Sequence, residues 1–329
     1  MRRFRFPFVL LFVAGTAYAS VRFTPRELFR IPFGDARGDV GSRVENGHLL
    51  IPRNFTIDDN GHFYIYDASH HRIARYSPDG TYEMEFRYLD TAQSVFAHVD
   101  AHENLWLLIS DPSKGIFCGV YSPQGQRLKA AIFTQYNHFR LHVDDGGALH
   151  VVLSSDKNSS ATQTYLLDEK TLLMKKENVG PPPENHHELR DNGRLLYVDP
   201  ALDATAFTSH PMTRITDSDH RRVADIEGDV IYVTAKGEIY TKVGARQLRV
   251  YDARGALKGT VTLTGLSSSC SSLRFDADGD IYQLDGIPDI AEDDPRLRAA
   301  RADPAVDRED LHYSGKMPGM RVIEWQRKL

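Results

Sequence analysis

Six polar residues recur along the chain at intervals of 37 to 49 residues, and some of them have side chains that bind metals. Two histidines with a carboxylate form a set that transition metals accept as ligands. The same residues would equally suit hydrogen bonding between neighbouring sheets, because buried polar groups are normally paired. We favour the pairing role and expect no metal. The six residues are Thr56, His98, His142, Glu188, Asp225 and Arg274.

Three arginines form a second candidate group for ligand binding. Arg53, Arg140 and Arg222 stand near the starts of alternate repeats, where guanidinium groups could hold a carboxylate or phosphate; the alternative is pairing with the many aspartates. Together with His98, His142 and His186 they are the ligand-binding candidates of the sequence.

Two histidine doublets and one ion pair complete the set of reactive side chains. Residues next to each other on an extended strand point to opposite sides, so His70-His71 and His186-His187 are poor chelating pairs, and we assign them to solvated loops. We assign Asp67 and Arg72 to an ion pair within one repeat. No Ser-His-Asp order, phosphate-binding glycine loop or reactive thiol stands out.

The elements that must position these residues are short β-strands. The clearest repeat, from Pro52 to Phe86, has an apolar strand, an Asp-Asn-Gly turn at 59–61, a second strand, and two strands flanking the turn at 77–80. Turn residues that accept positive φ between aromatic and β-branched runs are typical of hairpins. Four antiparallel strands make one propeller blade.

The repeat recurs six times, which predicts six blades. Each copy has an apolar residue at the end of its innermost strand, and the spacings are 42, 44, 46, 37 and 49 residues. The six positions are Ile57, Val99, Val143, Leu189, Ile226 and Phe275.

The last repeat is one strand short, because the chain ends soon after its third strand, 320–327. The alternating segment 27–33 belongs to no other repeat, and an open sheet edge would leave unpaired N–H and C=O groups. We therefore predict an all-β protein: a six-bladed β-propeller of four-stranded antiparallel blades, with the ring closed by the N-terminal strand.

The repeat resembles the NHL-repeat family, whose blades carry a proline, an apolar strand, Asp-x-x-Gly, an apolar-Tyr strand ending in Asp, then Arg and an aromatic residue before a glycine turn. The matching residues are Pro52, Asp58, Gly61, Tyr64, Asp67, Arg72, Tyr76 and Gly80. The segment 30–35 is similar to the entry segment of bacterial exported members. The resemblance implies the propeller fold and leaves function open.

The chain's start predicts an exported protein. Arg2, Arg3 and Arg5 precede a short apolar run, and Ala17-Tyr18-Ala19 has the small residues of a cleavage site, so residues 1–19 are expected to be a signal peptide. Residues 20–329 would form a single domain, periplasmic or secreted. No stretch is long enough to span a membrane.

Three further features of the sequence bear on nucleic-acid binding, cysteine pairing and the last blade. Without the leader the formal charge falls from −5 to −8, which disfavours nucleic acid. Cys118 and Cys270 fall two blades apart, so we expect two free thiols. An insertion at 286–319 in the last blade is the longest departure from the repeat and suits either a docking arm or a solvated loop.

These observations favour a non-enzymatic binding or scaffold protein. It would be a monomer without cofactor that presents its channel face to a protein, peptide or glycan of the cell envelope. The alternative is an envelope lyase or hydrolase with a divalent metal in the channel.

Overall fold

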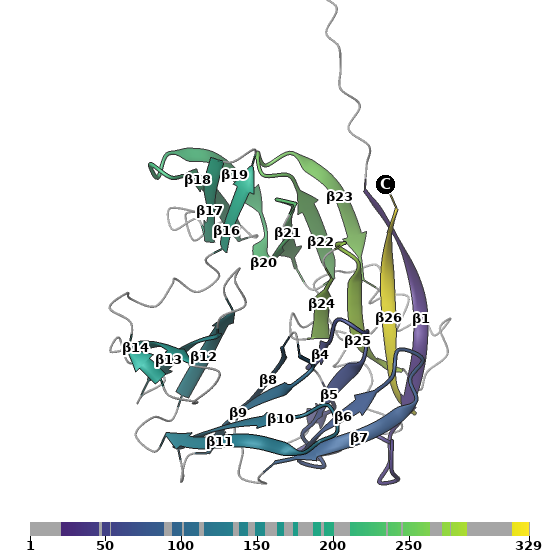
Figure 1. Ribbon diagram of the computed structural model, residues 1–329. Helices are drawn as coiled ribbons and strands as arrows, with labels where there is room; N and C mark the ends of the chain where they lie inside the picture. The colour runs from purple at the N-terminus through teal and green to yellow at the C-terminus, as the bar shows by residue number, and fades with distance from the viewer. Residues whose placement is uncertain are drawn as a thin grey trace, which may run out of the picture.

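The computed structural model describes an all-β chain with no α-helix among its described residues (Figure 1). For the strands between 138 and 194 it describes the backbone alone. The described residues are 21–45, 48–52, 54–88, 94–100, 102–111, 115–133, 138–143, 149–154, 163–167, 174–176, 187–191, 194–200, 211–234, 236–244, 246–263, 272–276, 278–287 and 318–328.

The described strands form six four-stranded antiparallel sheets, numbered here in chain order, and one two-stranded hairpin. Sheet one contains β4 (Phe55–Ile57), β5 (Phe63–Asp67), β6 (Arg72–Tyr76) and β7 (Tyr82–Arg87); sheet two contains β8 (Ser94–Val99), β9 (Leu105–Asp111), β10 (Gly115–Tyr121) and β11 (Arg127–Phe133). Sheet three contains β12 (His138–Val143), β13 (Leu149–Ser154), β14 (Gln163–Leu167) and β15 (Met174–Lys176); sheet four contains β16 (His187–Asp191), β17 (Arg194–Pro200), β18 (Met212–Asp217) and β19 (Arg222–Glu227). Sheet five contains β20 (Asp229–Val233), β21 (Ile239–Val243), β22 (Gln247–Tyr251) and β23 (Leu257–Thr262); sheet six contains β24 (Leu273–Phe275), β25 (Ile281–Ile287), β26 (Gly319–Lys328) and β1 (Arg22–Pro32), and the hairpin is β2 (Arg43–Glu45) with β3 (His48–Leu50).

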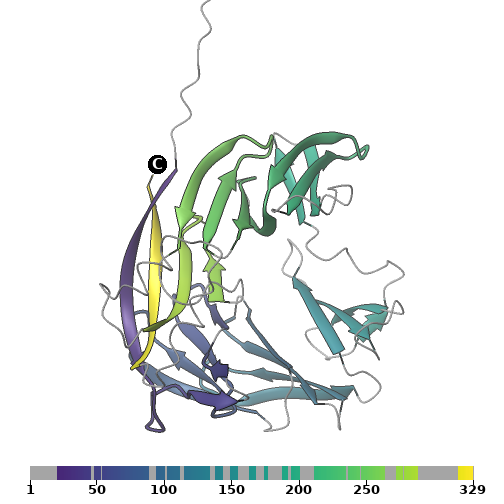
Figure 2. The same ribbon diagram turned by 180° about the vertical axis from the view of Figure 1, so that it is seen from behind.

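The N-terminal strand is the fourth strand of the last sheet. β1 pairs antiparallel with β26 from Arg22–Lys328 to Pro32–Gly319, with one bulge between Glu27 and Phe29. Both ribbon views show the two strands side by side (Figures 1 and 2). The predicted pairing of 27–33 with 320–327 is therefore confirmed.

A recurring aspartate shapes the turn after the innermost strand. Asp58 Oδ1 accepts hydrogen bonds from the backbone N–H groups of Asn60 (3.0 Å) and His62 (2.8 Å). This is the local capping that makes aspartate a turn residue. Asp100 and Asp276 bond the second and fourth following N–H groups in the same way. In these three sheets an aromatic residue six positions on also donates to the carboxylate: Tyr64, Trp106 and Tyr282.

The structure corrects the predicted position of the innermost strand of sheet five. The sequence prediction placed Ile226 at the end of its innermost strand, whereas Ile226 lies in β19, the last strand of sheet four. The true counterpart is Val233 in β20, which makes the last two spacings 44 and 42 residues. The repeat was hard to recognise here because Thr234 replaces the turn aspartate: its hydroxyl accepts from the backbone N–H of Glu238, 3.1 Å away.

The apolar core lies between consecutive sheets. Phe29 and Ile31 of β1 pack with Phe63 of sheet one and Val322 of β26 in one cluster. Other clusters join sheets one and two, four and five, and five and six. A single sheet cannot bury both of its apolar faces, so each depends on its neighbours, as in repeat proteins.

Three further expectations from the sequence concern the cysteines, membrane-spanning segments and the insertion in the last repeat. Cys118 is a buried free cysteine, as expected, and burial raises the pKa of its thiol to about 12; Cys270 lies outside the described residues. Among those residues no helix is long and apolar enough to cross a membrane. β25 ends at Ile287 and β26 begins at Gly319, so most of the predicted insertion also falls outside the described chain.

A substitution at Gly80 tests the packing of β1 on sheet one. Its φ is +85°, and a Cβ there would overlap the Phe29 side chain. We expect Gly80→Ala to lower the free energy of unfolding by about 2–4 kcal/mol, from left-handed backbone strain plus overpacking. Urea unfolding measures this.

Gly244→Ala is the matched control, because Gly244 also has positive φ (+64°) but a Cβ added there would have nothing within 4 Å. It should cost only the backbone strain, about 1 kcal/mol. Equal losses in the two variants would contradict the packing of β1 described above.

Candidate functional site

The residues chosen from the sequence as ligand-binding candidates do not form one site among the described residues. Arg53 and His186 lie outside them. Arg140 and His142 belong to β12, where the backbone alone is described. His98 is half-buried in β8 and pairs across the sheet with Trp106.

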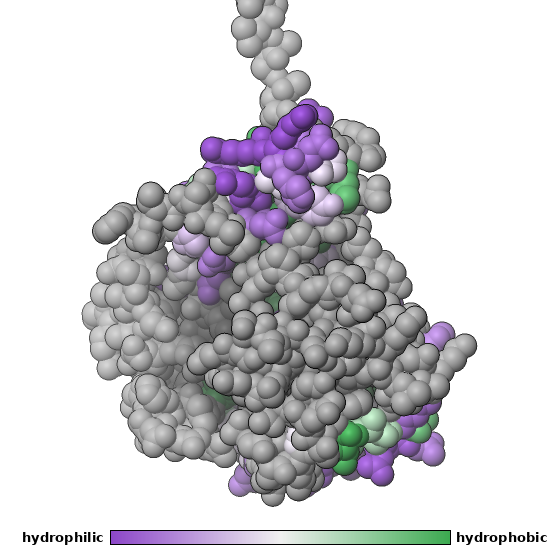
Figure 3. Space-filling model, turned by 90° about the vertical axis from the view of Figure 1, so that its left-hand side faces the viewer, coloured by the Kyte–Doolittle hydropathy of each residue, from purple (hydrophilic) through white to green (hydrophobic). Residues whose placement is uncertain are grey.

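Arg222 is the clearest misplacement. It begins β19, the outer strand of sheet four, rather than standing at the start of sheet five. Its guanidinium is 63% exposed and binds Asp225 at 2.9 Å. Figure 3 shows a largely hydrophilic surface over the β18–β19 hairpin. The predicted ring of three arginines is therefore wrong at this position, for the register reason given above.

Asp225, one of the six recurring polar residues considered as metal ligands, is misplaced for the same reason. Asp225 lies in β19 and is bound by Arg214 and Arg222. Tyr232 of β20 takes the equivalent place: it pairs with Tyr240 as Thr56 pairs with Tyr64. Within the described residues no three His, Cys, Asp or Glu side chains converge into a group that could hold a metal ion.

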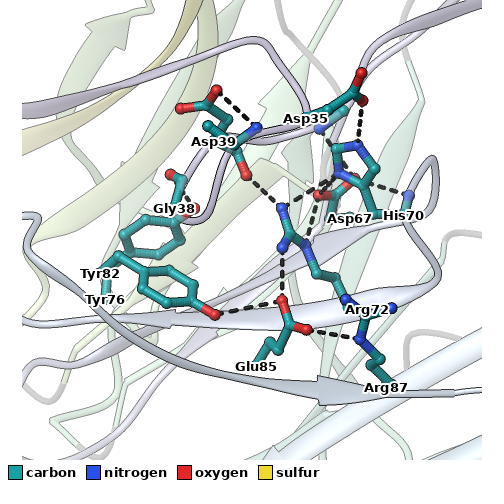
Figure 4. Close-up of polar contacts among 12 residues, drawn as sticks. Asp35, Gly38, Asp39, Asp67, His70, Arg72, Tyr76, Tyr82, Glu85 and Arg87 are labelled. Carbon is teal, nitrogen blue, oxygen red and sulfur yellow. Dashed lines mark hydrogen bonds and ion pairs between the residues drawn. The ribbon is translucent and has the colours of Figure 1, made fainter.

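A different group of polar side chains does converge, at the end of sheet one where β5 turns into β6 (Figure 4). We call Asp35, Asp67, His70, Arg72 and Glu85 the His70 cluster. Asp67 ends β5, Arg72 begins β6, and the tight turn between them carries His70. Asp35 comes from the segment after β1, and Glu85 from β7. The cluster thus joins the first and last sheets.

Asp67 is the buried anchor of the cluster, with a side chain that is 0% exposed. Its Oδ1 accepts from the backbone N–H of Gly41 at 3.1 Å. Its Oδ2 lies 3.1 Å from Arg72 Nε and 2.7 Å from His70 Nδ1. Gly41 is required at this approach, because a Cβ there would lie 3.0 Å from Oδ1 and overlap Ser69.

His70 is held at both ring nitrogens. Nδ1 donates to Asp67, while Nε2 lies 3.0 Å from Oδ1 of Asp35. The imidazole is 23% exposed, and Asp35 is fully exposed. Burial works against the charged imidazole, but the hydrogen bonds with Asp35 and Asp67 outweigh it and raise the pKa of His70 above its usual value. A histidine oriented by a buried aspartate is the arrangement that enzymes use for proton transfer.

Arg72 ties the cluster together. Its Nη1 donates to Glu85 Oε2 at 2.6 Å, and its Nη2 donates to the backbone oxygen of Asp39 at 2.6 Å. Burial alone would raise the pKa of Glu85, but hydrogen bonds from Arg72 and Arg87 hold it below its usual value. Arg72 is therefore a fixed structural cation that holds the carboxylates of Asp67 and Glu85 in place.

An open groove of about 480 Å³ lies beside the cluster. Asp35 and Arg72, both in contact with His70, are part of its wall. The other lining residues are Arg37, Tyr82, Met84, Glu85 and Arg87. Arg87 is 74% exposed, and the guanidinium of Arg37 lies 5.5 Å from the Tyr82 ring centroid. The groove offers arginines, carboxylates and one phenol to a small ligand, and Asp35 of its wall contacts His70.

Sequence reasoning found only part of this site. The predicted Asp67–Arg72 ion pair is confirmed at 3.1 Å. The assignment of His70 to a solvated loop is wrong, because the doublet was judged only as a chelating pair. The available signal was a histidine three residues after the strand-ending aspartate, a spacing that lets a tight turn bring the two side chains together. Asp35 and Glu85 had no such local signal.

No family model matches the chain, and no curated protein sequence matches it. Solved structures that resemble it include the PQQ-bound aldose sugar dehydrogenase of Streptomyces coelicolor, at 10% identity over 93% of this chain and 99% of that chain, with a TM-score of 0.48. A streptogramin B lyase matches at 10% identity over 93% and 98% of the two chains, with a TM-score of 0.43. The gluconolactonase XC5397 of Xanthomonas campestris matches at 13% identity over 92% and 100%, with a TM-score of 0.43.

At these identities and TM-scores the activity of each of these proteins is its own. The comparisons do correct one expectation from the sequence. A non-enzymatic binding or scaffold protein was favoured, yet the propeller-like structures named above are enzymes. The chain is all-β, built of four-stranded antiparallel sheets, and propeller-like.

Proposed function

We propose that this protein is an exported lyase or hydrolase in which His70 transfers the proton. The single observation that carries the proposal is the Asp67–His70 pair: a fully buried carboxylate 2.7 Å from Nδ1 of a partly exposed imidazole, whose neighbours Asp35 and Arg72 line an open groove. In this scheme Asp67 is a positioning residue. It fixes the tautomer with Nε2 facing the substrate, and it stabilises the imidazolium once His70 takes a proton.

Both reactions begin with the same step at Nε2. In a hydrolase, His70 removes a proton from water while the water oxygen attacks a carbonyl carbon, and the proton then passes to the departing alcohol. In a lyase, His70 removes a proton from carbon, and the C–H electrons form a double bond as the group on the next carbon leaves. The arginines of the groove would hold the anionic end of the substrate in either case.

The setting of this enzyme, as we propose it, is a six-bladed propeller of the NHL type in the periplasm or the medium. The pairing of β1 with β26 supports closure of the ring by the N-terminal strand. Apolar clusters join four pairs of neighbouring sheets, which supports the stacking of blades. The basic, apolar and small residues of 1–19 support export after cleavage before Ser20.

Ring closure can be tested by removing β1. A mature chain that begins at Gly38 instead of Ser20 lacks the partner of β26 and the side chains of Phe29 and Ile31. We expect it to lose its single cooperative urea transition, since β26 becomes an open edge and one inter-sheet core loses its centre. A sharp transition at an unchanged midpoint would contradict closure by β1.

The catalytic role can be tested with neighbouring histidines. We expect His70→Asn to lower kcat/KM about 100- to 10,000-fold, the usual contribution of general acid-base catalysis. The assay is turnover of aldonolactones and of 4-nitrophenyl esters with and without a carboxylate.

His71→Asn is the matched control. His71 has a φ of 51°, which asparagine tolerates, and its ring packs on Tyr88 away from the cluster contacts. It should keep wild-type turnover. Equal rates in wild-type and His70→Asn protein would remove His70 from the mechanism.

The protonation of His70 gives a test that needs no substrate. Asp35→Asn removes one of the two hydrogen-bonded carboxylates, so the pKa of His70 should fall, as read by NMR titration of its ring signals. The rising limb of the rate should move to lower pH with it, because the base must be neutral. Because the folded-state pKa is raised, His70 stabilises the fold below its unfolded pKa of about 6.5, and this is lost as pH rises through the folded value. An unmoved titration would contradict the pairing.

A further inference from the structure

We propose that the groove beside His70 binds a small carboxylate-bearing ligand, and that Asp35 occupies the ligand's position as a built-in competitor. This inference rests on the proposed function in that it names the substrate class of the same site. The geometry points to it through the contact of a fully exposed carboxylate with His70 Nε2, the nitrogen that a substrate must reach.

The contact between Asp35 and His70 is one that a ligand can replace. An ion pair with a fully exposed partner contributes little stability, because water screens it and both side chains lose freedom. Asp67, by contrast, is buried and held by Gly41, Arg72 and His70. Displacing Asp35 therefore leaves the catalytic pair intact.

The backbone around Asp35 is anchored at its base and exposed at its tip. Phe33 pairs with Val40 in a bridge, and Gly34 donates to the carbonyl oxygen of Val40 at 3.1 Å. Val40 is fully buried in the core between sheets six and one. Asp35, Ala36 and Arg37 at the tip are exposed. The tip can move its side chains while the segment's attachment to the core stays fixed.

Displacement of Asp35 removes one negative charge from the wall of the groove. Arg72 lies between Asp67 and Glu85 and forms an ion pair with each of them. Arg87 forms an ion pair with Glu85, with 2.6 Å between Nε and Oε1, and the guanidinium of Arg37 lies over the Tyr82 ring. When Asp35 leaves, Nε2 of His70 loses its exposed carboxylate partner, and Arg37 lines the groove without that negative charge beside it. A ligand carboxylate restores the balance, and a neutral ligand does not.

The remaining wall selects the body of the ligand. Tyr82 and Met84 line the groove beside the arginines. The phenol ring of Tyr82 is half-buried and its hydroxyl donates to Glu85 at 3.3 Å, so the ring is held in one orientation. A phenol held beside arginines suits a small polar ring that carries an acid group, such as a sugar acid. We therefore assign the site to an acidic monosaccharide or a similarly sized ring carboxylate.

The test uses D-glucuronate as the probe and D-glucose as its neutral match. Binding to the full mature protein is followed at pH 6 by isothermal titration calorimetry and by the NMR signals of His70. We expect glucuronate to bind at least tenfold more tightly than glucose and to shift the His70 signals but not those of His71. Equal affinities for the two sugars, or shifts confined to other residues, would overturn the assignment.

Two variants separate the competitor from the binding site. Asp35→Asn should tighten glucuronate binding about tenfold, because the competing carboxylate is gone. Arg37→Gln should weaken it by a similar factor. Both residues are exposed, and thermal unfolding checks that each variant is folded. Unchanged affinity in Asp35→Asn would overturn the role of Asp35 as competitor.

The proposed ligand class and the proposed catalytic role of His70 can fail independently. If glucuronate binds as described while His70→Asn leaves turnover unchanged, the ligand class stands and His70 is not the base. If turnover depends on His70 while glucuronate and glucose bind alike, the reaction stands and the carboxylate-bearing ligand is wrong.

Discussion

The antiparallel pairing of β1 with β26 is the interaction on which the rest of the structure depends. It joins residues from the two ends of the described chain, Arg22 and Lys328, in one ladder. Without it β26 would expose a row of unpaired backbone groups, and the core between the last and first sheets would lose Phe29 and Ile31. The neighbouring sheets would each lose a covering face. Local turn chemistry builds each sheet, but this long-range pairing holds the first sheet against the last.

The candidate site is a consequence of that pairing. The chain leaving β1 must cross to β4 of sheet one, and on its way it lays residues 35–41 against the β5–β6 turn. The backbone N–H of Gly41 and the carbonyl oxygen of Asp39 then bind Asp67 and Arg72. Asp35 reaches His70 by the same route. The crossing of the chain between the last and first sheets is therefore also what assembles the charged groups around His70.

Electrostatics explains why the cluster is suited to chemistry as well as to stability. Arg72 spreads one buried positive charge over two carboxylates and a backbone oxygen, so the buried Asp67 side chain has polar partners in place of solvent. A buried, fixed Asp67 can orient an imidazole, and Asp35 on the other side of that imidazole lines an open groove. A purely structural ion pair needs no groove beside it. This difference is what our functional proposal and the proposed carboxylate ligand both use.

The sequence by itself determined the strands, the turn aspartates and the partner of the last sheet. These depend on local chemistry: alternating apolar residues, Asp-x-x-Gly turns, and an orphan strand facing an open edge. It predicted the Asp67–Arg72 pair because strand pairing puts those two residues opposite each other. Local pattern failed at sheet five, where Thr234 replaces the turn aspartate and Arg222 was consequently misplaced. Only the tertiary structure decided that Asp35 and His70, 35 residues apart, share a hydrogen bond. No periodicity encodes such a contact, because it exists only after two sheets from opposite ends of the chain have packed together.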